Sequence, residues 1–145
     1  TWDLSIKGSE EFNSLYKTAD STYYFSFSTF STKKMKNSVY HKPTSKTVLM
    51  FRPSATLIGR SDSNDPSWNK NDSIVNTVSM GFPSSGNLGP EPNITYKGYP
   101  QKGVWQKMDE INESHHSIIG VHVSKTKSNK IFEIYKEHSK LLYSL

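Results

Sequence analysis

The apolar residues of this chain occur in short runs that long polar segments separate. Hydrophobic residues make up 33% of the 145 residues, which is little for a globule that builds its whole core from its own chain. Residues 31–46 are polar and basic, residues 83–103 are rich in Pro and Gly, and loops of such length are uncommon inside a compact domain. Two interpretations fit this pattern: a small loop-rich domain, or part of a larger sheet protein that supplies the rest of the core.

Several segments nevertheless have the periodicity of helices or strands. Residues 4–16 predict a short helix, and residues 131–145 predict an amphipathic terminal helix. Residues 21–29 (STYYFSFST) are rich in aromatic residues with a period of two, which predicts a strand. Residues 31–46 predict a mobile excursion. Together these segments predict a mixed α/β structure.

The composition excludes several classes of function. The chain has no cysteine, which excludes a disulfide framework, a thiolate nucleophile and a cysteine zinc site within it. No run approaches the roughly 18 apolar residues of a membrane span. The net charge of +5 permits contact with an anionic surface, but the lysines are scattered and no basic-aromatic module accompanies them. We therefore expect no nucleic-acid partner and no transmembrane segment.

An acid and a histidine occur in an order that is typical of one enzyme class. Asp72 follows a turn-rich run in NDSIVNTVSM, and His115 comes about forty residues later in ESHHSIIGV. The catalytic serine of an α/β-hydrolase is followed along the chain by the acid and then by the histidine. In such a triad the histidine takes the proton of the serine, and the acid orients the imidazole. The chain has no Gly-x-Ser-x-Gly motif that would supply the serine.

Each of these residues also has a purely structural interpretation. Asp72 could be a helix cap or a turn residue, and His115 could be a solvated loop histidine. His115, His116 and His122 could instead form a metal site, although their spacing matches no familiar two-ligand pattern. The spacing of the residues alone leaves these alternatives open.

Four motifs, taken together and in order, point to one family. They are WDLSIKGSEEFN, STYYFSFST, SWNKNDSIVNTVSM, and KGVWQKM followed by SHHSIIGV. In this combination the chain resembles the C-terminal part of the bacterial true lipases of the Geobacillus and staphylococcal type, which have the α/β-hydrolase fold. The resemblance spans nearly the whole chain. It implies that residues 1–145 are the C-terminal half of a single α/β-hydrolase domain, completed by an upstream segment or by a separate N-terminal chain.

The resemblance implies a carboxylic ester hydrolase, such as a lipase that acts on triacylglycerols or related acyl esters, and a secreted or extracellular location. Asp72 matches the catalytic acid of the family and His115 matches its catalytic histidine. The serine would lie upstream, so the chain would act only with an N-terminal partner that carries it. One alternative is a catalytically inactive lipase-fold protein with a structural, storage or binding role. Another, based on the net charge, is an independent small domain that binds an anionic surface.

Some positions depart from the family pattern. The family usually has Gly where this chain has Ser73, and Asp where it has Ser114. The positions that bind calcium in the thermophilic members correspond to Ser117 and His122, and a hydroxyl and an imidazole are poor ligands for calcium. We therefore predict that the calcium site is lost and that no cofactor is required. The zinc ligands of the family would precede Thr1, so the chain leaves zinc binding open.

Three sequons for N-glycosylation occur, at Asn71, Asn93 and Asn112. A glycan on Asn71 or Asn112 would crowd the predicted site. We expect modification of Asn93 alone, and only if the protein is secreted.

Overall fold

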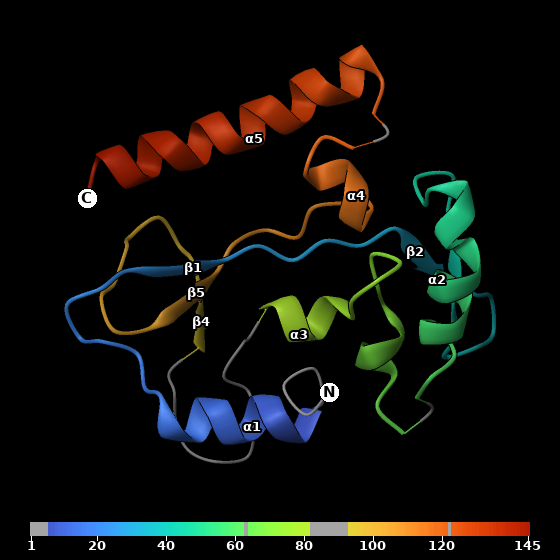
Figure 1. Ribbon diagram of the computed structural model, residues 1–145, viewed down its shortest axis with the longest axis horizontal. Helices are drawn as coiled ribbons and strands as arrows, with labels where there is room; N and C mark the ends of the chain where they lie inside the picture. The colour runs from blue at the N-terminus through green and yellow to red at the C-terminus, as the bar shows by residue number, and fades with distance from the viewer. Residues whose placement is uncertain (1–5, 63, 82–92, 122) are drawn as a thin grey trace. The chain divides into compact units, whose positions relative to one another are not determined.

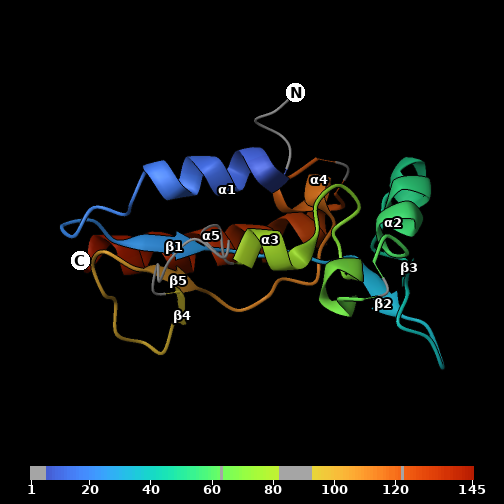
Figure 2. The same ribbon diagram turned by 90° about the horizontal axis from the view of Figure 1, so that it is seen from below.

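The computed structural model describes residues 6–62, 64–81, 93–121 and 123–145. The chain forms short strands, α-helices and 3-10 helices, and the 3-10 helices are named η in the text; Figures 1 and 2 show how the ribbon runs through them. In chain order the elements are α1 (Ile6–Leu15), β1 (Tyr24–Ser26), β2 (Thr32–Lys34), β3 (His41–Pro43), η2 (Leu49–Phe51), α2 (Arg52–Ile58), η3 (Pro66–Asn69), α3 (Thr77–Gly81), β4 (Asn93–Thr95), β5 (Trp105–Lys107), α4 (His115–Ile118) and α5 (Lys125–Tyr143). They belong to two compact units: Thr1–Ser28 with Val78–Glu110, and Thr29–Thr77 with Ile111–Leu145.

The first unit contains α1 and a small parallel sheet with the strand order β1-β5-β4. In β5, Trp105 pairs with Tyr24 of β1 and with Asn93 of β4, and the three strands lie side by side in both ribbon views (Figures 1 and 2). The rings of Tyr24 and Trp105 are 5.1 Å apart and stabilise this pairing. The strand predicted over residues 21–29 is therefore confirmed, but only for its three central residues.

In the second unit, β2 and β3 form an antiparallel hairpin in which Lys34 pairs with His41. Our prediction of a mobile excursion over residues 31–46 is therefore wrong. The turn of the hairpin includes Asn37, whose φ of 54° lies in the left-handed region that asparagine tolerates. Both strands are polar, so the hairpin lacks the hydrophobic alternation by which a strand is usually predicted.

Both predicted helices are confirmed. The N-terminal one is α1, and the terminal one is α5, which begins several residues earlier than predicted. At its start the hydroxyl of Ser124 accepts a hydrogen bond from the backbone N–H of Lys127 at 3.4 Å, as a capping residue does. Ile131 is buried. Within the described ranges, neither α5 nor another helix is both long enough and apolar enough to cross a membrane.

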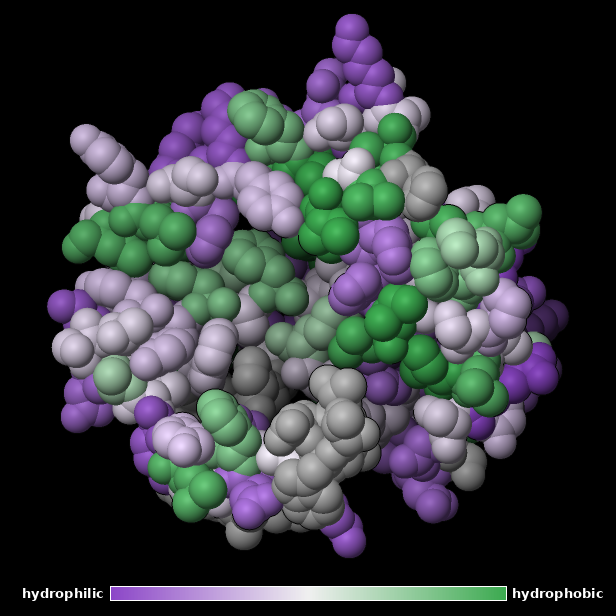
Figure 3. All heavy atoms as spheres, in the orientation of Figure 1, coloured by the Kyte–Doolittle hydropathy of each residue, from purple (hydrophilic) through white to green (hydrophobic). Residues whose placement is uncertain are grey.

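The interior of the described part of the chain is mostly polar. Its buried hydrophobic residues are Ala55 and Ile131, whereas large apolar side chains such as Leu49 and Leu57 are exposed. Figure 3 shows hydrophobic residues at the surface among hydrophilic ones. The buried polar residues are Ser26, Ser28, Thr29, Ser31, Thr32, Thr47, Asn69, Asn71, Asp72, Ser73, Thr77, Gln106, Glu113, Ser114 and Ser117. Most buried polar groups have hydrogen-bond partners, and those of Asn71 and Asp72 fix the positions of the side chains described next.

His41, the first residue of β3, is expected to make the stability of the chain depend on pH. Burial lowers the pKa of His41 below its ordinary value of 6.5, and the nearby Lys70 and Lys34 lower that pKa further. Below pH 6.5 the unfolded chain therefore binds a proton that the folded chain does not yet bind, and the free energy of unfolding falls as the pH falls. We expect a His41→Gln variant to lose part of this decline when urea unfolding is measured between pH 5 and 8. If the pH dependence of the variant were the same as that of the wild-type protein, His41 would not be the cause of the decline.

Candidate active site

Asp72 lies in a tight turn and its side chain is fully buried. The backbone N–H of Asp72 donates to the carbonyl of Val75 at 3.1 Å, which closes the turn. One carboxylate oxygen, Oδ1, accepts hydrogen bonds from the N–H groups of Ile74 at 3.0 Å and Val75 at 2.9 Å. The other oxygen, Oδ2, accepts from the hydroxyl of Thr29 at 2.7 Å. These three bonds compensate the carboxylate for its loss of water.

His115 supplies the fourth contact of this carboxylate. Its Nδ1 is 3.0 Å from Oδ2 of Asp72, and its backbone N–H donates to the carbonyl of Asp72, also at 3.0 Å. Because a carboxylate only accepts, the contact places the ring hydrogen on Nδ1. The lone pair of Nε2 can then accept a proton. The side chain of His115 is 40% exposed, whereas that of Asp72 is fully buried.

The structure thus brings the predicted acid and the predicted histidine together, and it adds Thr29 to them. Thr29 forms a parallel bridge with Ile111, and its carbonyl accepts a hydrogen bond from the hydroxyl of Thr77 at 2.8 Å. Sequence reasoning missed Thr29 as a partner of Asp72. The one signal was its place at the end of the predicted strand, because residues at strand ends often contribute to sites.

Asn71 and Ser73 hold the turn on either side of Asp72. The side-chain amide of Asn71 donates to the carbonyls of Ala55 at 3.1 Å and Asn69 at 3.0 Å, and its Oδ1 accepts from the N–H of Ser73 at 2.9 Å. Ser73 has a φ of 93°, a conformation that strains residues other than glycine. Its buried hydroxyl has no hydrogen-bond partner within the described part of the chain.

A Ser73→Gly variant of the whole protein should be more stable by about 1 kcal/mol, because glycine removes both the backbone strain and the unpaired hydroxyl. Urea unfolding monitored by circular dichroism measures the difference. The matched control is Ser61→Gly, at an exposed serine with an ordinary φ, where glycine should give no gain. If Ser73→Gly were as stable as the wild-type protein or less stable, Ser73 would not be strained.

Comparison with known proteins then identifies the family. A sequence model described as the lipase-like C-terminal domain matches residues 1–142. The chain belongs to this lipase-like family. The fold of the lipase-like chain is similar to that of three solved structures, one of which is the Staphylococcus hyicus lipase. With that lipase the TM-score is 0.83 and the sequence identity 24%, over 97% of this chain and 35% of the lipase.

Two further structures have the same fold. EstA from Clostridium botulinum matches with a TM-score of 0.72 and 27% identity, over 90% of this chain and 32% of EstA. Lipase 1 from Pelosinus fermentans matches with a TM-score of 0.64 and 25% identity, over 92% of this chain and 37% of that lipase. The lipase-like chain therefore spans about a third of the length of these proteins. The predicted resemblance to bacterial lipases and the predicted fold class, the C-terminal portion of an α/β-hydrolase, are both confirmed.

The predicted loss of the calcium site concerns Ser117 and His122. The hydroxyl of Ser117 lies 2.8 Å from that of Ser114 and accepts a hydrogen bond from the ammonium of Lys127 at 3.0 Å. A calcium ion at Ser117 would face this positive charge, and the described residues there include no group of three acidic or histidine side chains that could hold a metal ion, so Ser117 does not fit calcium. His122 lies outside the described residues, and the loss of the site stays a prediction.

The alternative metal site of three histidines gains no support from the part that is described. The ring of His116 stacks on Phe51 with centroids 4.1 Å apart, and its centroid is 5.6 Å from that of His115. Within the described ranges, no three His, Asp or Glu side chains are grouped so that they could hold a metal ion.

The sequons differ in accessibility. Asn71 is fully buried and its amide is engaged, so the folded lipase-like chain does not offer it for glycosylation. Asn112 is exposed. Asn93 begins β4, but its side chain lies outside the described part, and its modification stays a prediction.

Proposed function

We propose that this chain is the C-terminal half of a single α/β-hydrolase domain that hydrolyses carboxylic esters. The substrates would be triacylglycerols or related acyl esters. The observation that carries the proposal is the contact of 3.0 Å between Nδ1 of His115 and the buried Oδ2 of Asp72, in a member of a lipase-like family. The names of two similar structures, both lipases, support the same activity.

In the proposed reaction His115 acts as a general base and then as a general acid. Its Nε2 removes the proton of a serine hydroxyl as the serine oxygen attacks the ester carbonyl. The proton then passes to the leaving alkoxide, and an acyl-serine forms. A water molecule, deprotonated by the same nitrogen, attacks this ester, and the released serine oxygen recovers the proton. Asp72 holds the imidazole and stabilises its positive charge, and the reaction uses no cofactor.

The serine and the groups that stabilise the oxyanion would come from a segment outside these 145 residues. Three observations support this part of the proposal. The chain has no Gly-x-Ser-x-Gly motif. It spans about a third of the similar structures. Within the described ranges it buries two hydrophobic residues and exposes large ones such as Leu49 and Phe132, which a further segment would cover.

The deciding experiment measures hydrolysis of a nitrophenyl ester by the whole protein, in which the serine-bearing segment is present and its sequence is known. A serine-directed fluorophosphonate reports the nucleophile independently of the substrate. We expect turnover and stoichiometric labelling. If the serine of a Gly-x-Ser-x-Gly motif is present but neither signal is obtained, the protein is not an ester hydrolase, and the inactive lipase-fold alternative holds.

We also propose that the protein acts outside the cell, as the resemblance implies. Cell fractionation with an antibody tests this: the protein should be found in the culture medium. Its confinement to the cell interior would contradict the proposal.

A further inference from the structure

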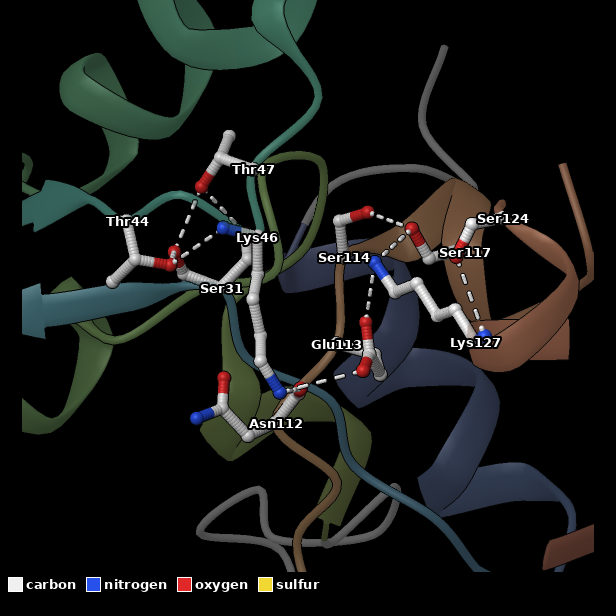
Figure 4. A network of polar contacts seen from close by, with 10 residues as sticks. All are labelled: Ser31, Thr44, Lys46, Thr47, Asn112, Glu113, Ser114, Ser117, Ser124 and Lys127. Atoms are coloured by element: carbon white, nitrogen blue, oxygen red, sulfur yellow. Dashed lines mark hydrogen bonds and ion pairs between the residues drawn. The ribbon is translucent and has the colours of Figure 1, made fainter. Parts of the chain in front are cut away.

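A buried acidic side chain lies two residues before His115 and belongs to no step of the proposed reaction. The side chain of Glu113 is 3% exposed, and its carboxylate lies between two ammonium groups. Nζ of Lys46 is 3.3 Å from Oε1, and Nζ of Lys127 is 2.7 Å from Oε2 (Figure 4). Lys46 follows β3, and Lys127 lies in the first turn of α5, so the carboxylate joins three segments that are distant in the sequence.

The two lysines also bind the chain on both sides of His115. Lys46 donates to the carbonyl of Asn112 at 2.6 Å, before the histidine. Lys127 donates to the hydroxyl of Ser117 at 3.0 Å, after it. Figure 4 shows both ammonium groups directed at this segment. The five residues from Glu113 to Ser117, with His115 at their centre, are therefore held at both ends.

Hydrogen bonds through Ser31 also connect the loop that carries Lys46 with the residue next to Asp72. The hydroxyls of Thr44 and Thr47 each donate to the carbonyl of Ser31 at 2.7 Å (Figure 4). The N–H of Ser31 donates to the carbonyl of Asn71, the neighbour of Asp72, at 2.9 Å. A continuous set of bonds therefore connects the turn of Asp72, through Lys46, with the segment of His115.

Burial distinguishes this cluster from the surface ion pairs of the chain. Glu133 and Lys136 of α5 are 3.1 Å apart, but their side chains are 57% and 47% exposed, and such pairs contribute little to stability. A buried carboxylate is costly to desolvate and requires its partners, so the removal of one partner leaves an uncompensated charge. The Glu113 cluster therefore constrains the position of the chain around it.

We propose, on the basis of the proposed function, that Glu113 is a positioning residue for His115. Its carboxylate, paired with Lys46 and Lys127, holds the His115 segment so that Nδ1 stays in hydrogen-bond contact with Asp72 and Nε2 points in one direction. Lys127 also places its ammonium charge beside Ser117, to whose hydroxyl it donates a hydrogen bond. Without the carboxylate, the two ammonium groups repel each other and release the segment.

The test compares Glu113→Gln with Glu133→Gln in the whole protein. Glu113→Gln keeps the size of the side chain and removes its charge. We expect its kcat to fall about 10- to 100-fold, the cost of a misplaced catalytic group, with KM unchanged. The proton NMR signal of Nδ1–H of His115 should shift or broaden. Glu133→Gln, which removes an exposed acid, should retain the wild-type kcat and signal.

A double variant and a milder one complete the test. If Lys127 acts through Glu113, then adding Lys127→Gln to Glu113→Gln should lower kcat by a smaller factor than Lys127→Gln does in the wild-type background.

If Glu113→Gln fails to fold, the milder Lys46→Gln variant decides, because Glu113 then keeps one partner. Its kcat should still fall several-fold. A folded variant with wild-type kcat and an unchanged His115 signal would overturn the proposal. If the wild-type protein hydrolyses no ester, the proposed function fails, and the NMR signal, which needs no substrate, still decides the positioning role.

Discussion

A His115→Ala variant of the whole protein is expected to hydrolyse nitrophenyl esters at least about 10⁴-fold more slowly in kcat/KM than the wild-type protein. The reason is that Nε2 is the proposed base and acid for both halves of the reaction. Steady-state kinetics measures the effect, and fluorophosphonate labelling should slow in parallel because the serine is no longer activated.

The control for this variant is His138→Gln, at a half-buried histidine of α5 that has no part in the proposed reaction. Its kcat/KM should match that of the wild-type protein. The backbone N–H of residue 115 still donates to the carbonyl of Asp72 in the alanine variant, so a large loss of structure is not expected, and circular dichroism checks this. A His115→Ala enzyme with more than a tenth of wild-type activity would show that another group is the base.

The second large effect is expected for Asp72→Asn, which should lower kcat about 10³- to 10⁴-fold while KM changes little. The asparagine oxygen can still accept from the N–H groups of Ile74 and Val75, so the turn is retained. The amide nitrogen then faces Thr29 and His115 and donates where the carboxylate accepted. This reverses the tautomer of the imidazole, and the proton on Nε2 prevents it from acting as a base.

The matched control for this variant is Asp65→Asn, at an exposed aspartate that caps η3. It should lose stability at most and keep its kcat. Equal kcat values for Asp72→Asn and the wild-type protein would exclude Asp72 as the catalytic acid.

The sequence predicted those parts of the fold that depend on local periodicity. The spacing of apolar residues predicted α1 and α5, and the aromatic run predicted β1. The hairpin of β2 and β3 was predicted wrongly, because its strands are polar and the left-handed Asn37 of its turn cannot be recognised from the residue type alone. Its strands are held by polar contacts with other segments, such as those of Thr32 with Asn71 and of His41 with Gly59, and such contacts leave no hydrophobic pattern in the sequence.

Of the residues of the candidate site, some could likewise be predicted from the sequence and others could not. Asp72 and His115 were predicted because residue order and the surrounding motifs carry their identity. Thr29 and Glu113 were not predicted, because their importance depends on which distant segments meet them. A buried glutamate between two lysines cannot be recognised until Lys46, Glu113 and Lys127 have been brought together from three parts of the chain.

The hydrogen bonds that the Asp72 carboxylate accepts differ in how far apart in the sequence their two partners lie. The carboxylate meets the N–H groups of Ile74 and Val75 within two and three residues, whereas His115 joins it across a separation of 43 residues. Closing a long loop costs more entropy than closing a short one, and such contacts form later in folding. The turn alone can therefore hold Oδ1 of the carboxylate, whereas Oδ2 acquires both of its partners, Thr29 and His115, only when segments 43 residues away meet it.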